Sequence, residues 1–243
     1  MGTYHASYYH PLSLAREKKE RFLIPLRWSL LFLLAAGGLF ISAPAPGEDF
    51  TLEVMGGDAY NFPTPLTVSQ AGYPDIQLTA QYDTRPYNAY APYYSWRVTL
   101  WDKDEGWEFQ QVHHKMFLTN PPPEIQNFAI HYGYNYFLLG HAWKRLGLVF
   151  HLDTGPIITN PSNTVLGQVL ETAGTGWFDQ GYDFSGWGAQ IAVSKNLYVT
   201  ANLFAVAEVA LMGGWAWSVP VSNGSADVPN LSLHGRLGLG LSI

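Results

Sequence analysis

The chain of 243 residues contains no cysteine. Disulfide bonds, thiolate nucleophiles and thiolate metal ligands are therefore excluded. Charged residues make up only 13% of the chain, although 47% of it is hydrophobic and 15% aromatic. So few charges are not typical of an ordinary soluble surface. The formal net charge of −6 provides no basic surface for nucleic acid, and we expect no such partner.

Long apolar runs are also scarce after residue 45. The nearest candidate for a transmembrane helix, residues 197–212, is interrupted by Asn202 and Glu208. A membrane location for this part of the chain must therefore use β-strands, which cross a bilayer only as a closed barrel.

Residues 1–47 have the composition of a targeting segment. An apolar run from Trp28 to Ala43 is preceded by basic residues and followed by small residues up to Gly47. The basic residues are Arg16, Lys18, Lys19, Arg21 and Arg27. This pattern predicts that residues 48–243 are exported as the folded domain. Residues 1–47 are then either a cleaved signal peptide or an uncleaved inner-membrane anchor, because the segment is long for a signal peptide.

Residues 126–153 show the clearest strand pattern, with two alternating runs around a break at residues 141–145. On the first run, one face carries Phe128, Ile130, Tyr132, Tyr134, Tyr136 and Leu138, and the other carries His131, Gly133 and Asn135. On the second run, Leu146, Leu148, Phe150 and Leu152 oppose His151 and Asp153. Because side chains alternate along a strand, each run predicts one apolar and one polar face.

Shorter alternating runs, separated by turn residues, occur along the rest of the exported part. We expect them at residues 50–55, 66–69, 76–82, 94–101, 108–118, 184–193, 197–212 and 231–243. The predicted fold is therefore all-β: a single antiparallel closed β-barrel of about eight strands within residues 48–243, closed by its last strand.

Alternation alone does not tell whether the apolar face points into the barrel or out into a membrane. Several runs exceed the roughly 5–6 residues of soluble strands and match the roughly 9–11 needed to cross a bilayer. Aromatic residues also gather near the run ends, as membrane girdles do: Tyr93, Tyr94, Trp96, Trp101, Trp107, Trp143, Trp187, Trp215 and Trp217. We therefore expect the tyrosine-rich face to contact lipid. The alternative is an inner-membrane-anchored periplasmic barrel that acts as a binding or complex-stabilising subunit.

The C-terminal run alternates up to the final residue. Arg236, Gly238, Leu241 and Ile243 supply a polar residue, a glycine and two hydrophobic residues at fixed spacing. This tail resembles the terminal assembly signal of bacterial outer-membrane β-barrel proteins, although Ile243 replaces the usual final aromatic residue. The resemblance implies an outer-membrane location, with membrane lipids and the assembly machinery as partners, and implies no activity.

Polar residues of neighbouring strands are expected to meet inside the barrel. A register that pairs odd with odd residues places His113 opposite His131, and a hairpin centred near residue 142 places Asp153 close to His131. The predicted lumen contains His113, Lys115, His131, Asn135, His151 and Asp153, with His234 and Arg236 from the last strand. His114 would then face lipid.

Two functions fit such a lumen. The first is a structural or binding barrel whose interior is filled by polar side chains. The second is an enzyme that modifies acyl chains of a lipid A-type lipid, with His131 as general base oriented by Asp153 and assisted by His113. Whether the protein is an enzyme stays open here, since no GxSxG motif marks a nucleophile and Ser232 is a weak candidate.

The remaining polar residues would bind rather than react: Lys115, Asn135, His151, His234 and Arg236. We expect no cofactor and no metal, because the imidazoles do not have a recognised metal-ligand spacing. The loop at residues 159–182, with Trp177, Phe178 and Tyr182, is the candidate surface for a protein partner.

Overall fold

A computed structural model of the chain describes residues 50–87, 92–172, 176 and 180–243. These residues form thirteen β-strands. Within those ranges no helix is long and apolar enough to span a bilayer. The predicted signal peptide or anchor at residues 1–47 lies outside the described residues and stays a prediction.

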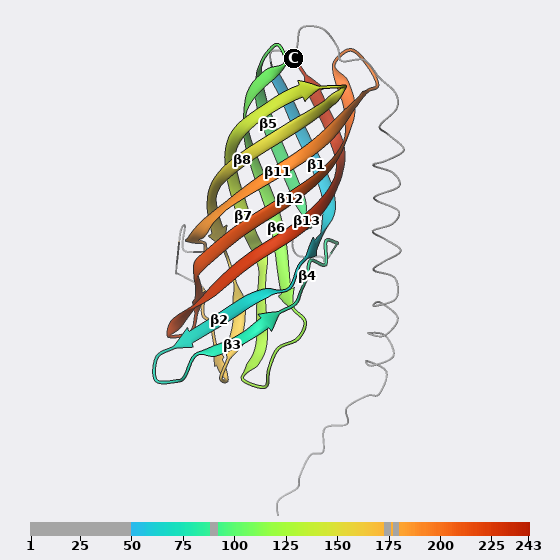
Figure 1. Cartoon of the computed structure of the whole chain (residues 1–243). Helices are drawn as coiled ribbons and strands as arrows, with labels where there is room; N and C mark the ends of the chain where they lie inside the picture. The colour runs from blue at the N-terminus through green and yellow to red at the C-terminus, as the bar shows by residue number, and fades with distance from the viewer. Residues whose placement is uncertain (1–49, 88–91, 173–175, 177–179) are drawn as a thin grey trace, which may run out of the picture. The chain divides into compact units, whose positions relative to one another are not determined.

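Eight of the strands close into an antiparallel ring (Figure 1). The ring consists of β1 (Phe50–Asn61), β5 (Tyr94–Asp102), β6 (Glu105–Leu118), β7 (Ile125–Arg145), β8 (Leu148–Thr159), β11 (Asp183–Tyr198), β12 (Leu203–Val221) and β13 (Gly224–Ser242). The last strand, β13, pairs with both β12 and β1 and so closes the barrel. The predicted fold class, a single antiparallel barrel of eight strands closed by its last strand, is confirmed.

The two ends of the barrel differ in their connections. At the end that holds the C-terminus, β5 and β6 are joined by two residues, and so are β7 and β8 (Figure 1). Leu146 and Gly147, which join β7 to β8, both have positive φ (55° and 73°), as a two-residue type I′ turn requires. The opposite end carries the long connections. Membrane barrels have short periplasmic turns and longer extracellular loops, so we name the ends periplasmic and extracellular accordingly.

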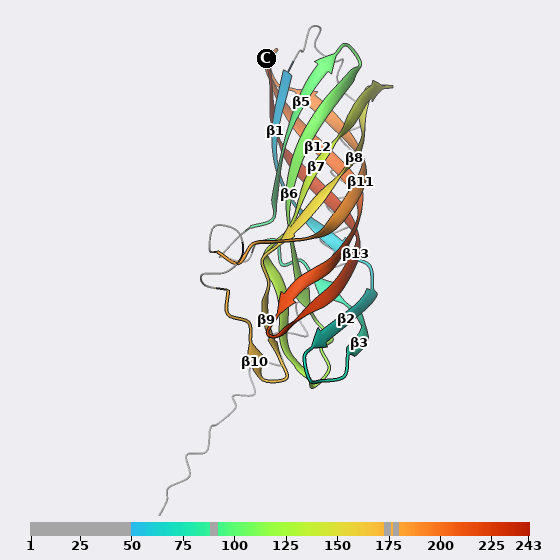
Figure 2. The ribbon, with the colours of Figure 1, turned by 90° about the vertical axis from the view of Figure 1, so that its left-hand side faces the viewer.

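Five short strands extend the sheet at the extracellular end (Figure 2). They are β2 (Thr64–Gln70), β3 (Ile76–Ala80), β4 (Tyr82–Asp83), β9 (Ser162–Val165) and β10 (Gln168–Val169). β2 pairs with the start of β13, β4 with the end of β6, and β9 with the start of β7. β7, β12 and β13 have 21, 19 and 19 residues, about twice the number that crosses a bilayer. These strands therefore belong partly to the membrane and partly to the extracellular extension.

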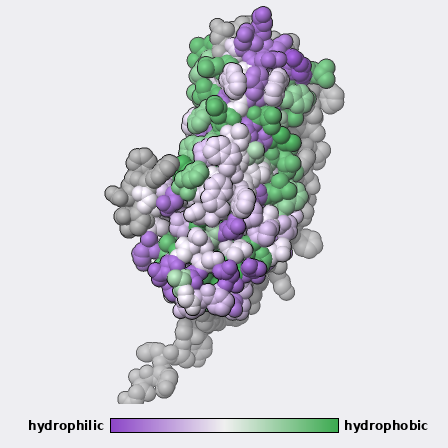
Figure 3. Space-filling model, turned by 60° about the vertical axis from the view of Figure 1, so that its left-hand side comes forward, coloured by the Kyte–Doolittle hydropathy of each residue, from purple (hydrophilic) through white to green (hydrophobic). Residues whose placement is uncertain are grey.

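The polarity of the inner and outer faces of the barrel changes along the strands. Near the periplasmic end of β6, Glu108 and Gln110 are buried inside while Trp107 and Phe109 are exposed. We call this part, with a polar interior and an apolar exterior, the membrane section. In Figure 3, hydrophobic residues lie between a hydrophilic rim at the periplasmic end and a mainly hydrophilic surface at the extracellular end.

Beyond residue 111 of β6 the interior becomes apolar. Val112 and Met116 belong to the buried core. On β13, Val228 and Ala226 take the inward positions on the extracellular side of Ser232. We call this part, together with β2, β3, β4, β9 and β10, the extracellular section. Its core also contains Leu66, Val68, Tyr82, Ile125, Phe128, Ile130, Tyr134, Ile157, Val165, Val219 and Val221. It is packed like a soluble barrel, with apolar side chains inside.

The predicted orientation of the tyrosine-rich face is wrong. Tyr134 and Tyr136 are fully buried inside the barrel, and Tyr132 is exposed. The turn lies at Leu146–Gly147, not near residue 142, so even residues of β7 share the interior with odd residues of β8. The prediction for the second strand is right, because Leu152 is exposed and His151 and Asp153 are buried.

Two glycines make room for an inward tyrosine. A Cβ atom on Gly188 of β11 would lie 2.5 Å from the ring of Tyr136, and one on Gly214 of β12 would lie 2.8 Å from its hydroxyl. These two glycines are paired across the sheet, and the ring packs over both. By contrast, a Cβ atom on the neighbouring Gly213 would meet nothing within 4 Å.

We therefore expect Gly188→Ala to lower the free energy of unfolding by about 1–3 kcal/mol, because a fully buried ring has no space into which to shift. Gly213→Ala is the matched control and should change it by less than about 0.5 kcal/mol. Urea unfolding in lipid vesicles, followed by tryptophan fluorescence, measures both. Equal effects of the two substitutions would contradict the packing described here.

Candidate functional site

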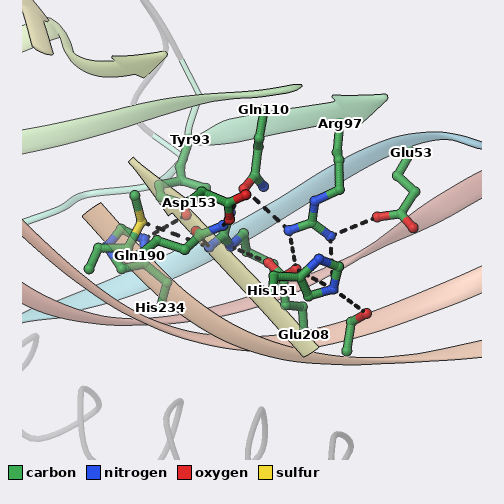
Figure 4. Close-up of polar contacts among 12 residues, drawn as sticks. Glu53, Tyr93, Arg97, Gln110, His151, Asp153, Gln190, Glu208 and His234 are labelled. Atoms are coloured by element: carbon green, nitrogen blue, oxygen red, sulfur yellow. Dashed lines mark hydrogen bonds and ion pairs between the residues drawn. The ribbon is translucent and has the colours of Figure 1, made fainter. Parts of the chain in front are cut away.

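The interior of the membrane section is built around Arg97 of β5, which is fully buried (Figure 4). Its guanidinium contacts Glu208 of β12 at 2.5 Å and Glu53 of β1 at 3.0 Å, and its Nε lies 3.5 Å from Glu108 of β6. Arg236 of β13 contacts the same Glu208 at 2.9 Å. Two arginines thus hold three carboxylates from three strands, and we call this set the Arg97 network.

A chain of amides extends the network to the other side of the ring. Arg236 donates to the side-chain oxygen of Gln190 (2.6 Å), and the Gln190 amide donates to Asp153 (2.7 Å) and to Gln110 (2.5 Å). On β7, Gly140 faces Asp153, and a Cβ atom there would overlap the carboxyl group. Side chains from seven of the eight ring strands thus meet in the interior, and Gly140 of β7 leaves room for Asp153.

His151 of β8 joins this network through both ring nitrogens. Its Nε2 lies 3.4 Å from Arg97 and 3.0 Å from Ser194 Oγ, and its Nδ1 lies 2.9 Å from Glu108. Because a guanidinium only donates, Nε2 must accept, and the proton of the neutral ring is on Nδ1, where it is donated to Glu108. Ser194, His151 and Glu108 therefore have the order and tautomer of a serine–histidine–carboxylate triad.

A second polar chain runs through the interior on the extracellular side of the Arg97 network. Ser232 donates to Asn230 (2.8 Å), so its oxygen accepts from Nε2 of His234 (2.8 Å), whose Nδ1 accepts from the Tyr93 hydroxyl (2.7 Å). Burial raises the pKa of Tyr93 above its ordinary value, which keeps this hydroxyl a donor. Because Ser232 does not give its proton to His234, the histidine cannot act on it as a general base.

The polar residues predicted for the lumen divide into two groups. His151, Asp153, His234 and Arg236 are buried inside the barrel, as predicted. His113, Lys115, His131 and Asn135 lie on odd positions of β6 and β7, which face outward, because Val112, Met116, Tyr134 and Tyr136 occupy the inside. His114, predicted to face lipid, is buried inside, where its Nε2 lies 2.9 Å from Asn61.

The predicted pairings of these residues are wrong, although odd residues of β6 do pair with odd residues of β7. His113 pairs with Asn135 instead of His131, because the β6–β7 connection is centred one residue later than predicted and β7 also bulges between Ile130 and Tyr134. Asp153 pairs with Gly140, since the hairpin turn lies at Leu146–Gly147. The structure therefore does not bring His131 and Asp153 together, and the proposed base and its orienting carboxylate are on opposite sides of the barrel wall.

The sequence contained a signal for the interior charges that the prediction did not use. Arg97, Glu108 and Glu208 each stand between outward apolar neighbours in an alternating run. A charged residue at such a position marks the lumen of a membrane barrel. Ser194 could not be recognised in this way, because it carries no charge and its partners, His151 and Glu108, come from other strands, β8 and β6. In the described ranges no group of three histidine, aspartate or glutamate side chains is arranged to hold a metal ion.

A closed eight-stranded ring with a charged interior and an apolar exterior defines a small outer-membrane β-barrel protein. The predicted location in the outer membrane agrees with this architecture. No family model matches the chain, and no curated protein matches it.

Solved structures with a similar fold are outer-membrane proteins, among them OprG from Pseudomonas aeruginosa. It has 10% identity and a TM-score of 0.46, and the match covers 83% of this chain and 99% of OprG. AlkL has 11% identity and a TM-score of 0.44, covering 84% of this chain and 93% of AlkL. Ail of Yersinia pestis has 10% identity and a TM-score of 0.39, covering 81% and 100%. Similarity this low tells nothing about what the chain binds or does.

Replacing the central arginine should be far more costly than replacing an exposed one. Arg97→Ala would leave buried carboxylates without their partner, and we expect it to lower the free energy of unfolding by about 3–5 kcal/mol. Arg145→Ala is the control, because Arg145 is 57% exposed and lies 3.7 Å from an exposed Glu105. Its loss should cost less than about 1 kcal/mol. Urea unfolding in vesicles compares the two, and similar losses would contradict a structural role for Arg97.

Proposed function

We propose that this outer-membrane protein is a barrel of structural or binding type, closed by its own side chains and without turnover. The observation that carries the proposal is the Arg97 network, in which buried charges from β1, β5, β6, β12 and β13 are paired with one another. An eight-stranded barrel is only wide enough for its side chains. Charges that are buried and paired are expensive to separate, so the network acts as a plug.

Binding would then depend on the extracellular section. Its packed apolar core gives a rigid support, and binding residues are commonly found in loops on such a support. The loop predicted to be the partner surface, residues 159–182, contains β9 and β10 in its described part, and both strands belong to this section. Trp177 and Phe178 of this loop lie outside the described residues. The side chain of Val169 on β10 is exposed.

Conductance measurements test the plug. Full-length protein in a planar bilayer should give no steady ion current above that of the lipid alone. The double substitution Arg97→Ala and Glu208→Ala removes the central pair and should produce a measurable current, provided that the protein still shows heat-modifiable migration on a gel. A steady current through the unsubstituted protein would overturn the proposal.

The triad geometry of Ser194, His151 and Glu108 favours a second candidate, an acyl-modifying enzyme that uses residues other than the predicted His131 and Asp153. Two contacts count against it. Ser194 is only 1% exposed, and Arg97 donates to the same His151 nitrogen that would have to take the serine proton. A nucleophile that no substrate reaches has no reaction to catalyse.

A fluorophosphonate probe, which reacts with activated serines, distinguishes the two candidates. We expect no labelling of the folded protein in detergent, because Ser194 is enclosed, and no change in the acyl pattern of lipid A in cells that carry the protein. Labelling that disappears in Ser194→Ala but persists in Ser232→Ala would instead support the enzyme.

A further inference from the structure

Two buried carboxyl groups meet over a glycine inside the membrane section. Gly140 of β7 pairs with Glu108 of β6 on one side and with Asp153 of β8 on the other. Gly140 has no side chain, and a Cβ atom there would overlap Oδ1 of Asp153. The carboxyl group of Asp153 therefore lies over Gly140, where it is hydrogen-bonded to the carboxyl group of Glu108. We call Glu108 and Asp153 the carboxyl pair.

A hydrogen bond between two carboxyl groups requires a proton on one of them. Ionised carboxylates only accept hydrogen bonds, so two of them in contact repel each other, whereas a protonated carboxyl group donates. Oδ1 of Asp153 is buried, and no N–H or O–H donor of the described residues is bonded to it. A proton on this oxygen, donated to Glu108, satisfies both carboxyl groups.

The surroundings of the pair determine which member carries the proton. Glu108 accepts a hydrogen bond from Nδ1 of His151 (2.9 Å), and Nε of Arg97 lies 3.5 Å from it. Asp153 accepts a hydrogen bond from the Gln190 amide (2.7 Å) (Figure 4). Hydrogen bonds and a nearby cation stabilise the ionised form of a carboxyl group. Glu108 is therefore the carboxylate of the pair, and Asp153 is the acid.

The charge balance of the interior leads to the same assignment. The Arg97 network and Asp153 together contain four carboxyl groups and two guanidinium groups. His151 adds no charge, because its Nε2 accepts from Arg97 and so carries no proton. Asp153 is 1% exposed, and an additional ionised carboxylate at this position would be costly. A proton on Asp153 removes that charge.

We infer that Glu108 and Asp153 share one proton, and that this proton is a fixed part of the closed interior. It converts two groups of like charge into a donor and an acceptor, so the polar interior is complete only while the proton is bound. The inference goes beyond the plug proposed above, because it concerns protonation and not conductance. A conducting barrel can hold this proton and a closed one can lack it, so the two failures are distinguishable.

Infrared spectroscopy of the full-length protein, refolded in a detergent without ester groups, detects the proton. The carbonyl stretch of a protonated carboxyl group is separate from the bands of carboxylates and amides. We expect this band at neutral pH in the unsubstituted protein and its loss in Asp153→Asn. Asp83→Asn is the control, since Asp83 is about half exposed beside Arg85, and it should keep the band. Absence of the band from the unsubstituted protein, or its persistence in Asp153→Asn, would overturn the inference.

The variant Glu108→Gln tests whether the proton is shared. Its side-chain amide donates to Asp153, which then needs no proton, so the band should disappear here as well. A band that persists in Glu108→Gln but is lost in Asp153→Asn would identify an acid that does not depend on Glu108, and would contradict a shared proton. Heat-modifiable migration on a gel confirms that each variant is folded before its spectrum is compared.

The pair also predicts how stability depends on pH. A free carboxyl group loses its proton at about pH 4, so above this pH the folded barrel binds a proton that the unfolded chain does not. The stability of the unsubstituted protein relative to Asp153→Asn therefore falls as the pH rises, because the asparagine amide donates to Glu108 at every pH. Between about pH 5 and 8, the folding equilibrium of Asp153→Asn relative to the unsubstituted protein should rise by up to about tenfold per pH unit.

Urea unfolding in vesicles at several pH values measures this difference. The charged and titratable groups that face the pair from other strands are the same in both proteins: Glu53 of β1, Arg97 of β5, His151 of β8, Glu208 of β12 and Arg236 of β13. β11 contributes the uncharged Gln190 and Ser194, and β7 contributes Gly140. The titration of the shared groups thus cancels in the comparison. A difference that stays constant over this pH range would overturn the shared proton.

Discussion

The pairing of Arg97 with Glu208 is the contact on which the interior of the barrel depends. Glu208 also holds Arg236, and Arg97 also holds Glu53 and Glu108, so neither charge can be removed without leaving another unpaired. In a bilayer there is no water to solvate a charge that loses its partner. The same pair thus fixes how β5 and β12, on different sides of the ring, face each other.

Much of the fold could be predicted from the sequence, because each ring strand has a period of two and lies between turn residues. The class, the strand number and the closing role of β13 followed from this pattern. The face of β7 did not, since the assignment assumed that the apolar, tyrosine-rich face of a membrane strand meets lipid along its whole length. Tyr134 and Tyr136 instead belong to an apolar interior, and the turn at Leu146–Gly147, not near residue 142, changes the parity of the pairing with β8.

The candidate sites were predictable only in part for a related reason. His234 and Arg236 were placed correctly, because β13 carries leucines on its opposite face up to the C-terminus. His113 and Lys115 were placed inside on the assumption that polar residues face the lumen along the whole strand. That assumption fails beyond the membrane section, where apolar residues fill the interior. The bulge at Gly133, which positions His131, had no signal beyond a single glycine.

The reversal of the two faces along β6 and β13 has a consequence for strand assembly. If one of these strands slipped by a single residue, Glu108 or Arg236 would meet lipid in one half of the molecule. In the other half, the same slip would turn inward apolar residues, such as Val112 of β6 or Val228 of β13, toward water. Lipid in one half and water in the other would each disfavour the slipped register, so misaligned pairing is destabilised in both halves of the strand. A barrel confined to the membrane has only the first of these two penalties.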